Sequence, residues 1–445
     1  MARLFGTDGI RGIANDDLDA MTAYRVGQSA AVILTGQAKH RPSIVIGKDT
    51  RISSDMLESA LIAGVTSAGA DVILCGTAPT PAVAYLTLRH ADAGIVISAS
   101  HNPFEYNGIK IFDQDGYKLP DELEDKIEAQ MSKNITLKKG VAIGRVLPAG
   151  SCGLEEYIEH LHQAVPADLG KLKIVVDCAN GAASATAKAL FSRYCPAALE
   201  ILCHDPNGVN INDCCGSTHM ESLRKRVLEG GFDIGIAFDG DADRCLALDN
   251  SGGIIDGDRI MAVCAKNEQL SGHLPDDTFV ATVMSNLGLH TWVKNAGLRM
   301  ACTAVGDRYV LERMRDKGYL LGGEQSGHVI FSRHSTTGDG QLTALKFLSI
   351  LALSRSTSRE LVNDIPYYPQ VLLNLEVTPE LKEFWHEKEE IAKAITKAEL
   401  ELGNEGRVLV RPSGTEALIR VMVEGKDLKN IQSVAEYIGK AIREA

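Results

Sequence analysis

The chain has 445 residues, a formal net charge of −12 and 45% apolar residues. The chain is too long for a single domain with one hydrophobic core, because domains usually contain roughly 100–200 residues. The acidic balance argues against a broad nucleic-acid surface, which would need a basic stripe, so we expect no nucleic-acid partner. No apolar run approaches the roughly 18 residues of a membrane span, so we expect no membrane partner either.

The first residues and the distribution of cysteines indicate the cellular compartment in which the protein is expected. Residues 1–8 carry neither the basic nor the apolar region of a signal peptide. The ten cysteines are scattered without a C-x-x-C pair, and Cys214 and Cys215 are the only adjacent ones. Both observations favour reduced thiols and a cytoplasmic location.

Short, apolar, β-branched runs alternate with helix-like stretches over the first two-thirds of the chain. This alternation predicts several similar α/β units with parallel layers. The predicted strands are residues 43–47, 72–75, 94–97, 173–176, 232–238, 279–283 and 318–321. Polar, glycine-rich loops follow several of them, at residues 48–51, 98–101, 177–181, 239–244 and 322–328. Ligands of open α/β sheets bind at the carboxyl ends of strands, so these loops are the expected site.

Three segments predict breaks between units: a Gly- and Pro-rich linker at 138–151, a turn at 250–253 and a hinge at 366–369. Beyond the hinge the pattern changes to a helix at 384–402 and strands at 407–410 and 418–423. Five apolar residues then mark a closing amphipathic helix: Ile431, Val434, Ala435, Ile438 and Ile442. This last part is expected to be α+β.

The run Gly94–Phe104 ends an apolar strand abruptly in Ser98, Ser100, His101 and Asn102. Such a strand delivers a hydroxyl to the rim of a sheet, and Ser100 is the candidate nucleophile. A capping or turn serine is the alternative. A protease-like triad is disfavoured, because no G-x-S-x-G elbow surrounds Ser100.

Asp239, Asp241 and Asp243 alternate, so they point the same way in an extended loop. Three close carboxylates raise each other's pKa unless a cation sits among them, and oxygen ligands favour Mg²⁺. The alternatives are a solvated acidic turn and a Ca²⁺ loop. An EF-hand is disfavoured, because position twelve is Asn250 and a strand precedes the loop.

Two further loops offer groups for a phosphorylated sugar. The loop at 411–416 offers a candidate phosphate site, with a guanidinium, hydroxyls and open backbone N–H groups from Arg411, Ser413, Gly414 and Thr415, and with Arg420 on the next strand. The alternative is a simple turn, because Pro-Ser-Gly is also a common turn sequence. In residues 322–328, Glu324 and Ser326 can bond adjacent sugar hydroxyls, unless the loop is merely polar. His328 is either a proton carrier or a hydrogen-bonding neighbour.

Two basic residues are candidates beside the nucleophile. Arg11 lies between glycines in residues 6–12 and is free to reach an anion, with a surface turn as the alternative. Lys110 is expected to return on a short hairpin past Asn107 and Gly108 and to face the same site.

With these motifs assembled, the chain resembles the α-D-phosphohexomutases. The matching stretches are GTDGIRG at 6–12, GKDTR at 47–51, ISASHNP at 97–103, DGDADR at 239–244, GGEQSGH at 322–328 and RPSGTE at 411–416. Gln325 before Ser-Gly-His, the opening motif and the run 367–371 are similar to the bacterial branch that acts on glucosamine phosphates. Tyr106 departs from that branch, which commonly has Asp there.

The resemblance implies three related α/β domains with mixed sheets and a smaller C-terminal α+β domain around a central cleft. Combined with the breaks above, it places the domains at residues 1–150, 151–252, 253–366 and 367–445. It implies a phosphorylated Ser100, with Mg²⁺ on that phosphate and the three aspartates. Arg244, in the DGDADR motif, is carried over as a substrate-binding residue.

The implied reaction interconverts glucosamine 6- and 1-phosphates through a 1,6-bisphosphate, for amino-sugar and cell-wall precursor synthesis. Arg11 and Lys110 would lie near the transferred group, with Lys110 or His101 handling the proton. The expected partners are the phosphosugar, a kinase or bisphosphate donor that first phosphorylates Ser100, and a second copy in a homodimer. Mannose or glucose phosphate specificity, a Mg²⁺-dependent sugar phosphatase and a non-catalytic phosphosugar sensor are the alternatives.

Overall fold

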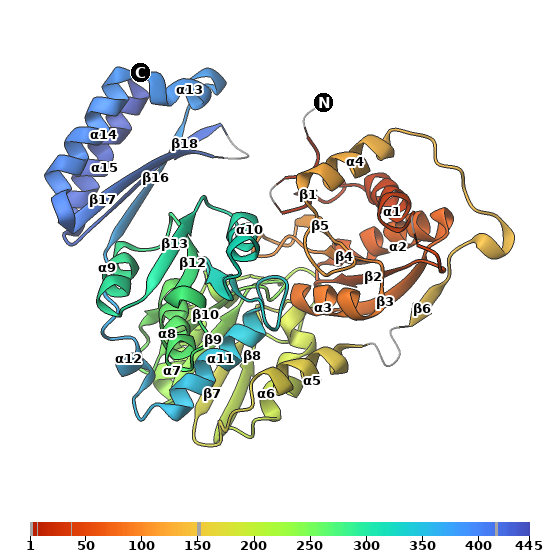
Figure 1. The fold of residues 1–445 in the computed structure, drawn as a ribbon, viewed down its shortest axis with the longest axis horizontal. Helices are drawn as coiled ribbons and strands as arrows, with labels where there is room; N and C mark the ends of the chain where they lie inside the picture. Colours follow the sequence, from red (N-terminus) through yellow and green to blue (C-terminus); the bar gives the residue numbers. More distant parts are fainter. Residues whose placement is uncertain (1–2, 7, 37, 149–152, 414–416) are drawn as a thin grey trace. The chain divides into compact units, whose positions relative to one another are not determined.

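The computed structural model describes residues 3–6, 8–36, 38–148, 153–413 and 417–445 (Figure 1). It divides into two compact units. The first comprises the described parts of residues 1–284 and 298–363, and the second comprises residues 285–297 and 364–445. Within the described ranges, no helix has both the length and the apolar character needed to cross a membrane.

The first sheet of the first unit has six strands in the order β1-β5-β4-β2-β3-β6. The pairs β1/β5 and β5/β4 are antiparallel and the others parallel, so the sheet is mixed. Its elements are β1 (Ile10–Ile13), α1 (Ala20–Thr35), β2 (Ser43–Lys48), α2 (Ile52–Ala68), β3 (Asp71–Thr77), α3 (Thr80–His90), β4 (Ala93–Ile97), β5 (Tyr106–Phe112), α4 (Asp121–Met131), a 3-10 turn (Gly140–Ala142) and β6 (Val146–Pro148).

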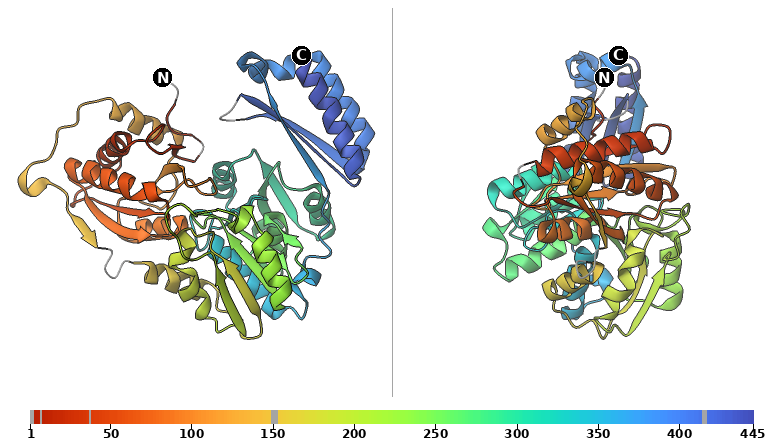
Figure 2. Two further views of the ribbon diagram at one scale, coloured as in Figure 1. Left: turned by 180° about the vertical axis from the view of Figure 1, so that it is seen from behind. Right: turned by 90° about the vertical axis from the view of Figure 1, so that its right-hand side faces the viewer.

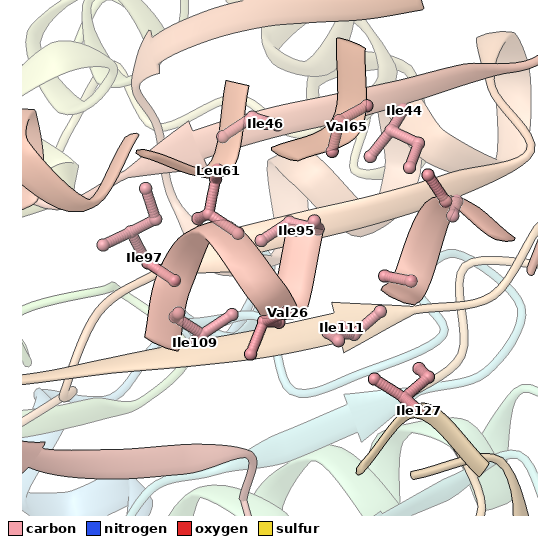
Figure 3. Close-up of a cluster of buried hydrophobic side chains, with 14 of the residues drawn as sticks. Val26, Ile44, Ile46, Leu61, Val65, Ile95, Ile97, Ile109, Ile111 and Ile127 are labelled. Atoms are coloured by element: carbon pink, nitrogen blue, oxygen red, sulfur yellow. The ribbon is translucent and has the colours of Figure 1, made fainter. Parts of the chain in front are cut away.

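Apolar side chains fill both faces of this sheet, as the continuous apolar runs predict. Isoleucines of β2, β4 and β5 meet side chains from three helices, α1, α2 and α4, on one face (Figure 3). Val45, which points the opposite way in β2, packs on the other face with Val83 and Leu86 of α3. Helices on both faces leave the strand ends as the place where polar loops gather.

The second sheet has five strands in the order β11-β10-β9-β7-β8. The three strands β9, β7 and β8 are parallel, and β10 and β11 are antiparallel additions. The elements are α5 (Leu154–Ala164), β7 (Lys173–Asp177), a 3-10 turn (Ala182–Ala185), α6 (Ala187–Ser192), β8 (Ala198–Leu202), a 3-10 turn (Gly216–Thr218), α7 (Glu221–Gly230), β9 (Ile234–Phe238), β10 (Cys245–Asp249) and β11 (Ile254–Ile255).

The third sheet has four strands in the order β13-β12-β14-β15, with β14/β15 antiparallel and the other two pairs parallel. The elements are α8 (Gly257–Leu270), a 3-10 turn (Pro275–Asp277), β12 (Thr278–Thr282), β13 (Arg299–Thr303), α10 (Asp307–Lys317), β14 (Leu321–Gly323), β15 (Val329–Phe331), α11 (Gly340–Leu353) and α12 (Ser358–Leu361).

The second unit contains an antiparallel sheet in the order β16-β18-β17. Two helices, α14 and α15, lie side by side along one face of this sheet (Figures 1 and 2). The elements are α9 (Leu287–Asn295), β16 (Gln370–Glu376), α13 (Pro379–Phe384), a 3-10 turn (Trp385–Glu387), α14 (Glu389–Leu402), a 3-10 turn (Gly403–Glu405), β17 (Gly406–Pro412), β18 (Leu418–Gly425) and α15 (Leu428–Arg443).

The predicted fold class is confirmed: three mixed α/β sheets and a smaller α+β part. The five apolar residues of the closing helix are buried, as their spacing predicts. The domain limits at residues 150, 252 and 366, and the hinge at 366–369, remain predictions.

Four local predictions were wrong. The segment 138–151 is not only a linker, because it contains β6, which pairs with β3. The strand predicted at 318–321 starts at Leu321, because Gly318, with a left-handed φ of 70°, ends α10. The helix predicted at 384–402 starts at Glu389, after a 3-10 turn. The predicted loop 411–416 starts later, because β17 continues through Arg411 to Pro412.

Candidate active site

Ser100 lies in the turn that follows β4 and is 1% exposed. Its backbone is left-handed, with a φ of 52°, which a residue with a side chain rarely adopts. The Ser100 N–H donates to Ser98 Oγ (2.9 Å), and the Ser100 carbonyl accepts from Arg51 (2.9 Å) and Asn212 (2.9 Å). Three hydrogen bonds therefore hold the turn in a conformation that costs energy.

A buried ion pair supports this turn from behind. The side chains of Asp49 and Arg51 are both 0% exposed, and Arg51 Nε lies 2.8 Å from Asp49 Oδ2. Asp49 Oδ2 also accepts from Ser98 Oγ (2.6 Å). The sequence interpretation assigned no role to Asp49 or Arg51, although both lie in the motif at 47–51.

The hydroxyl of Ser100 faces the aspartates that follow β9. Ser100 Oγ donates to Asp239 Oδ2 at 2.5 Å. Next to it, a Cβ on Gly240 would lie 2.4 Å from the Ser100 carbonyl oxygen, so only glycine allows this approach. The structure therefore brings the predicted nucleophile and the predicted metal loop together.

Asp239, Asp241 and Asp243 are buried, and one oxygen of each lies within 4.8 Å of the others. Burial and the two neighbouring carboxylates raise the pKa of Asp239 to about 8. Asp241 Oδ1 and Asp243 Oδ1 are buried without a hydrogen-bond partner among the described residues. Buried oxygens of this kind fit a hard cation such as Mg²⁺, so the cluster could bind a metal.

Lys110 lies on β5 and reaches the same cluster. Its Nζ is 2.7 Å from Asp241 Oδ2 and 3.1 Å from Asp8 Oδ2. Burial lowers the pKa of Lys110, but Asp241, Asp8 and Asp243 outweigh it and leave the pKa raised. The expected hairpin is confirmed, because β5 returns antiparallel to β4; Asn107 and Gly108 lie within β5, and the turn lies between Ile97 and Tyr106.

His101 lies between Ser100 and Arg244. Its Nδ1 is 3.4 Å from Ser100 Oγ and 3.2 Å from a terminal nitrogen of the Arg244 guanidinium. Burial, Arg244 and Arg11 lower the pKa of His101 to about 4. Since a guanidinium only donates, Nδ1 is the acceptor and the ring proton resides on Nε2.

Arg11 on β1 pairs with Asp8, which also contacts Lys110 and Lys118. Lys118 in turn pairs with Asp307 at the start of α10. Sequence reasoning missed Asp8, Lys118 and Asp307. Asp8 lies in the GTDGIRG motif at residues 6–12, whereas nothing in the sequence connects Lys118 with Asp307, 189 positions away.

The residues predicted to bind the sugar lie next to the aspartate loop. Cys245 N–H donates to the carbonyl of Gly327 at 3.0 Å, which joins the loop after β14 to the start of β10. Glu324 and Ser326 are partly exposed, with Ser326 Oγ 3.5 Å from Glu324 Oε2. His328 is buried, with Nδ1 3.5 Å from Asp243 Oδ2. His328 is therefore a neighbour of the aspartate cluster.

The predicted anion site belongs to the second unit. Arg411 on β17 lies directly opposite Arg420 on β18. Residues directly opposite one another in an antiparallel pair lie on the same face of the sheet, so the two arginines share one face. Ser413 is buried, and its N–H donates to the Leu418 carbonyl (2.8 Å). Gly414 and Thr415 lie outside the described residues.

A buried serine hydroxyl, three carboxylates suited to Mg²⁺ and several cations form an arrangement suited to phosphoryl transfer. Four families of phosphoglucomutase/phosphomannomutase domains match the chain in order. They are α/β/α domain I at residues 2–138, domain II at 155–252, domain III at 256–368 and the C-terminal domain at 372–441. The chain therefore belongs to the phosphoglucomutase/phosphomannomutase family.

Individual proteins refine this comparison. A phosphoglucosamine mutase of Thermoanaerobacter pseudethanolicus is 52% identical over 446 residues, which cover 99% of each chain. A solved phosphoglucomutase/phosphomannomutase family protein from Burkholderia thailandensis has a TM-score of 0.82 at 24% identity, covering 99% of this chain and 97% of its own. Aspergillus fumigatus N-acetylphosphoglucosamine mutase, solved with GlcNAc-6P and magnesium, has a TM-score of 0.72 at 19% identity, covering 99% and 95%. The two structures support the fold.

Proposed function

We propose that this chain is a phosphoglucosamine mutase, which interconverts glucosamine 6-phosphate and glucosamine 1-phosphate. The observation that carries the proposal is the position of Ser100 Oγ, 2.5 Å from Asp239 in a buried cluster of three carboxylates. The substrate follows from relatives such as the 52% identical phosphoglucosamine mutase, which matches over nearly the whole chain.

The first half-reaction starts from phosphorylated Ser100. A free sugar hydroxyl attacks phosphorus, the bond from phosphorus to Ser100 Oγ breaks, and the sugar becomes a 1,6-bisphosphate. The sugar hydroxyl loses a proton and the serine oxygen regains one, so atoms and charge balance. Transfer back from the other position of the sugar regenerates phosphorylated Ser100 and releases the isomer.

Asp239, Asp241, Asp243 and phosphorylated Ser100 would hold Mg²⁺, which supplies positive charge that offsets the charge of the transferred group. Lys110 and Arg11 add protein cations on the same side, because Asp8 links them. His101 is better placed than Lys110 to handle the proton. Its Nδ1 lies 3.4 Å from Ser100 Oγ, whereas Lys110 Nζ contacts carboxylates.

The second half-reaction needs the sugar in the opposite orientation. Arg411 and Arg420, opposite one another on two strands, would hold the phosphate that is not reacting, together with Ser413, Gly414 and Thr415. Hydroxyls of the sugar would bond to Glu324 and Ser326 in both orientations, and Arg244 and His328 would also contribute to substrate binding.

Ser100 would receive its first phosphate from a kinase or from a sugar 1,6-bisphosphate, which would also act as activator. Association into a homodimer remains a prediction that light scattering of the purified protein checks.

Phosphorus NMR with Mg²⁺ and a trace of sugar bisphosphate tests the reaction. Glucosamine, glucose and mannose 6-phosphates are offered separately, and the 1-phosphate should form fastest from glucosamine. Ser100→Ala should abolish turnover, while Ser59→Ala, in an exposed turn of α2, should leave it unchanged. Faster conversion of glucose or mannose 6-phosphate would indicate a mutase with a different sugar specificity. Release of inorganic phosphate would indicate a phosphatase.

A further inference from the structure

A second cluster of metal-binding side chains lies at the carboxyl ends of β7 and β8. Asp177 is the last residue of β7, and Cys203 directly follows β8, its parallel neighbour. Cys215 comes from the loop before the 3-10 turn at Gly216–Thr218. The three side chains converge from segments up to 38 positions apart, at the same sheet edge as Asp239 after β9.

The ligand atoms of Asp177, Cys203 and Cys215 all lie within 4.8 Å of one another. Asp177 is 0% and Cys215 1% exposed, whereas Cys203 is partly exposed and gives access from solvent. The contact with Cys203, together with burial and the Asp177 charge, raises the pKa of Cys215. The ligand-atom distances place the two thiols close together beside a buried carboxylate.

Neighbouring backbone and side-chain groups orient this cluster. Asp177 accepts hydrogen bonds from the N–H groups of Ala179 (2.8 Å) and Gly216 (3.0 Å). Asn180 Nδ2 lies 3.8 Å from Cys215 Sγ. Hydrogen bonds that fix the ligands from outside are a regular feature of metal sites in proteins.

We propose that Asp177, Cys203 and Cys215 form a binding site for a thiophilic divalent cation, Zn²⁺, separate from the magnesium site. Two thiolates and a carboxylate are a donor set that Zn²⁺ prefers over Mg²⁺. Zn–S bonds of about 2.3 Å in a tetrahedral centre place two sulfurs about 3.8 Å apart. A spacing within 4.8 Å is compatible with this distance, and water would complete the fourth position.

Binding exchanges protons for the cation. Each thiol forms one bond to the metal and releases one proton to solvent, and Asp177 would bind as a carboxylate, so charge and atoms balance. No oxidant is required.

Zn²⁺ bound at this site would stabilise the loop that carries Asn212. Asn212 Nδ2 donates to the carbonyl oxygens of Ser100 (2.9 Å) and Asn102 (3.1 Å), and its own N–H donates to the Ala179 carbonyl (2.9 Å). Cys215 lies three positions beyond Asn212. A cation on Cys215 would therefore stabilise one of the contacts that hold the Ser100 turn.

Titration of the reduced, chelator-treated full chain with Co²⁺ tests the proposal. One equivalent should give a sulfur-to-cobalt charge-transfer band in the near ultraviolet, which Zn²⁺ then removes. Cobalt bound only by oxygens, as at Asp239, Asp241 and Asp243, gives no such band. Cys203→Ser and Cys215→Ser should each lose the band, while Cys214→Ser, an exposed neighbour, should keep it.

A second measurement needs no variant. Stoichiometric Zn²⁺ should protect the partly exposed Cys203, but not the exposed Cys195, from alkylation, as read by peptide mass spectrometry. The absence of a thiolate band, or equal alkylation of Cys203 with and without Zn²⁺, would overturn the site. A Cys203–Cys215 disulfide in freshly purified protein, with no metal uptake after reduction, would also overturn it and indicate a redox pair.

Discussion

Removal of one oxygen atom from Ser98 should disable the Ser100 turn. In Ser98→Ala, the buried Ser100 N–H loses its acceptor at 2.9 Å and Asp49 loses a donor at 2.6 Å. Asp49 keeps Arg51 and Ser54, so the main loss is the unsatisfied N–H, at about 1–3 kcal/mol. If the active conformation of the turn is destabilised by this amount, the turnover rate should fall about 5- to 150-fold, because each 1.36 kcal/mol corresponds to a tenfold change in rate.

Initial rates of 1-phosphate formation, measured at saturating Mg²⁺, test this magnitude. Ser59→Ala is the matched control, because its hydroxyl bonds an exposed carbonyl within α2. Far-UV circular dichroism spectra of both variants should match that of the wild type, because most hydrogen bonds around Asp49 and Ser100 remain. Activity of Ser98→Ala within twofold of the wild type would refute the idea that these hydrogen bonds hold the nucleophile in place.

Three further variants test other parts of the structure. Burial raises the pKa of Glu124 to about 7, so its contribution to stability is present below its ordinary pKa of 4.5 and is lost as pH rises through 7. Glu124→Gln cannot ionise, so its free energy of unfolding should rise by about 1–3 kcal/mol relative to that of the wild type between pH 5 and pH 8. The exposed control Glu122→Gln should show no such rise. A stability difference between Glu124→Gln and the wild type that does not change with pH would contradict this prediction. Gly240→Ala would place a Cβ 2.4 Å from a backbone oxygen, so turnover should fall at least tenfold, and calorimetry should show weaker Mg²⁺ binding; normal values for both would refute the close approach. Arg411→Ala should raise KM about 10- to 150-fold through the loss of a charge-assisted hydrogen bond of about 1.5–3 kcal/mol, and should also slow transfer; kinetics near wild type would exclude Arg411 from the phosphate site.

The sequence predicted the elements whose signal is local. Strands such as β2 and β4 are continuous apolar runs, and Asp239, Asp241 and Asp243 alternate within five residues, so both could be recognised without tertiary information. The edge strand β6 was read as a linker, because three residues beside glycines carry little periodicity and only pairing with β3 defines it.

The parts of the site that escaped prediction depend on long-range contacts. Lys118 and Asp307 meet only after two sheets have formed, and neither lies in a distinctive motif. Asp49 and Arg51 were visible as polar residues after β2, but their role in holding Ser100 follows from burial and hydrogen-bond geometry. The cluster of Asp177, Cys203 and Cys215 was invisible for the same reason, because its thiols do not follow a C-x-x-C spacing.

The most direct test of the proposed mechanism follows one phosphoryl group. The protein is first phosphorylated with a ³²P-labelled sugar bisphosphate, and the labelled peptide is identified by mass spectrometry. Unlabelled glucosamine 6-phosphate is then added for a single turnover. We predict that the label is on Ser100 and moves to the sugar, with little inorganic phosphate. Label on another residue, or its transfer to water, would contradict a phosphoserine mutase.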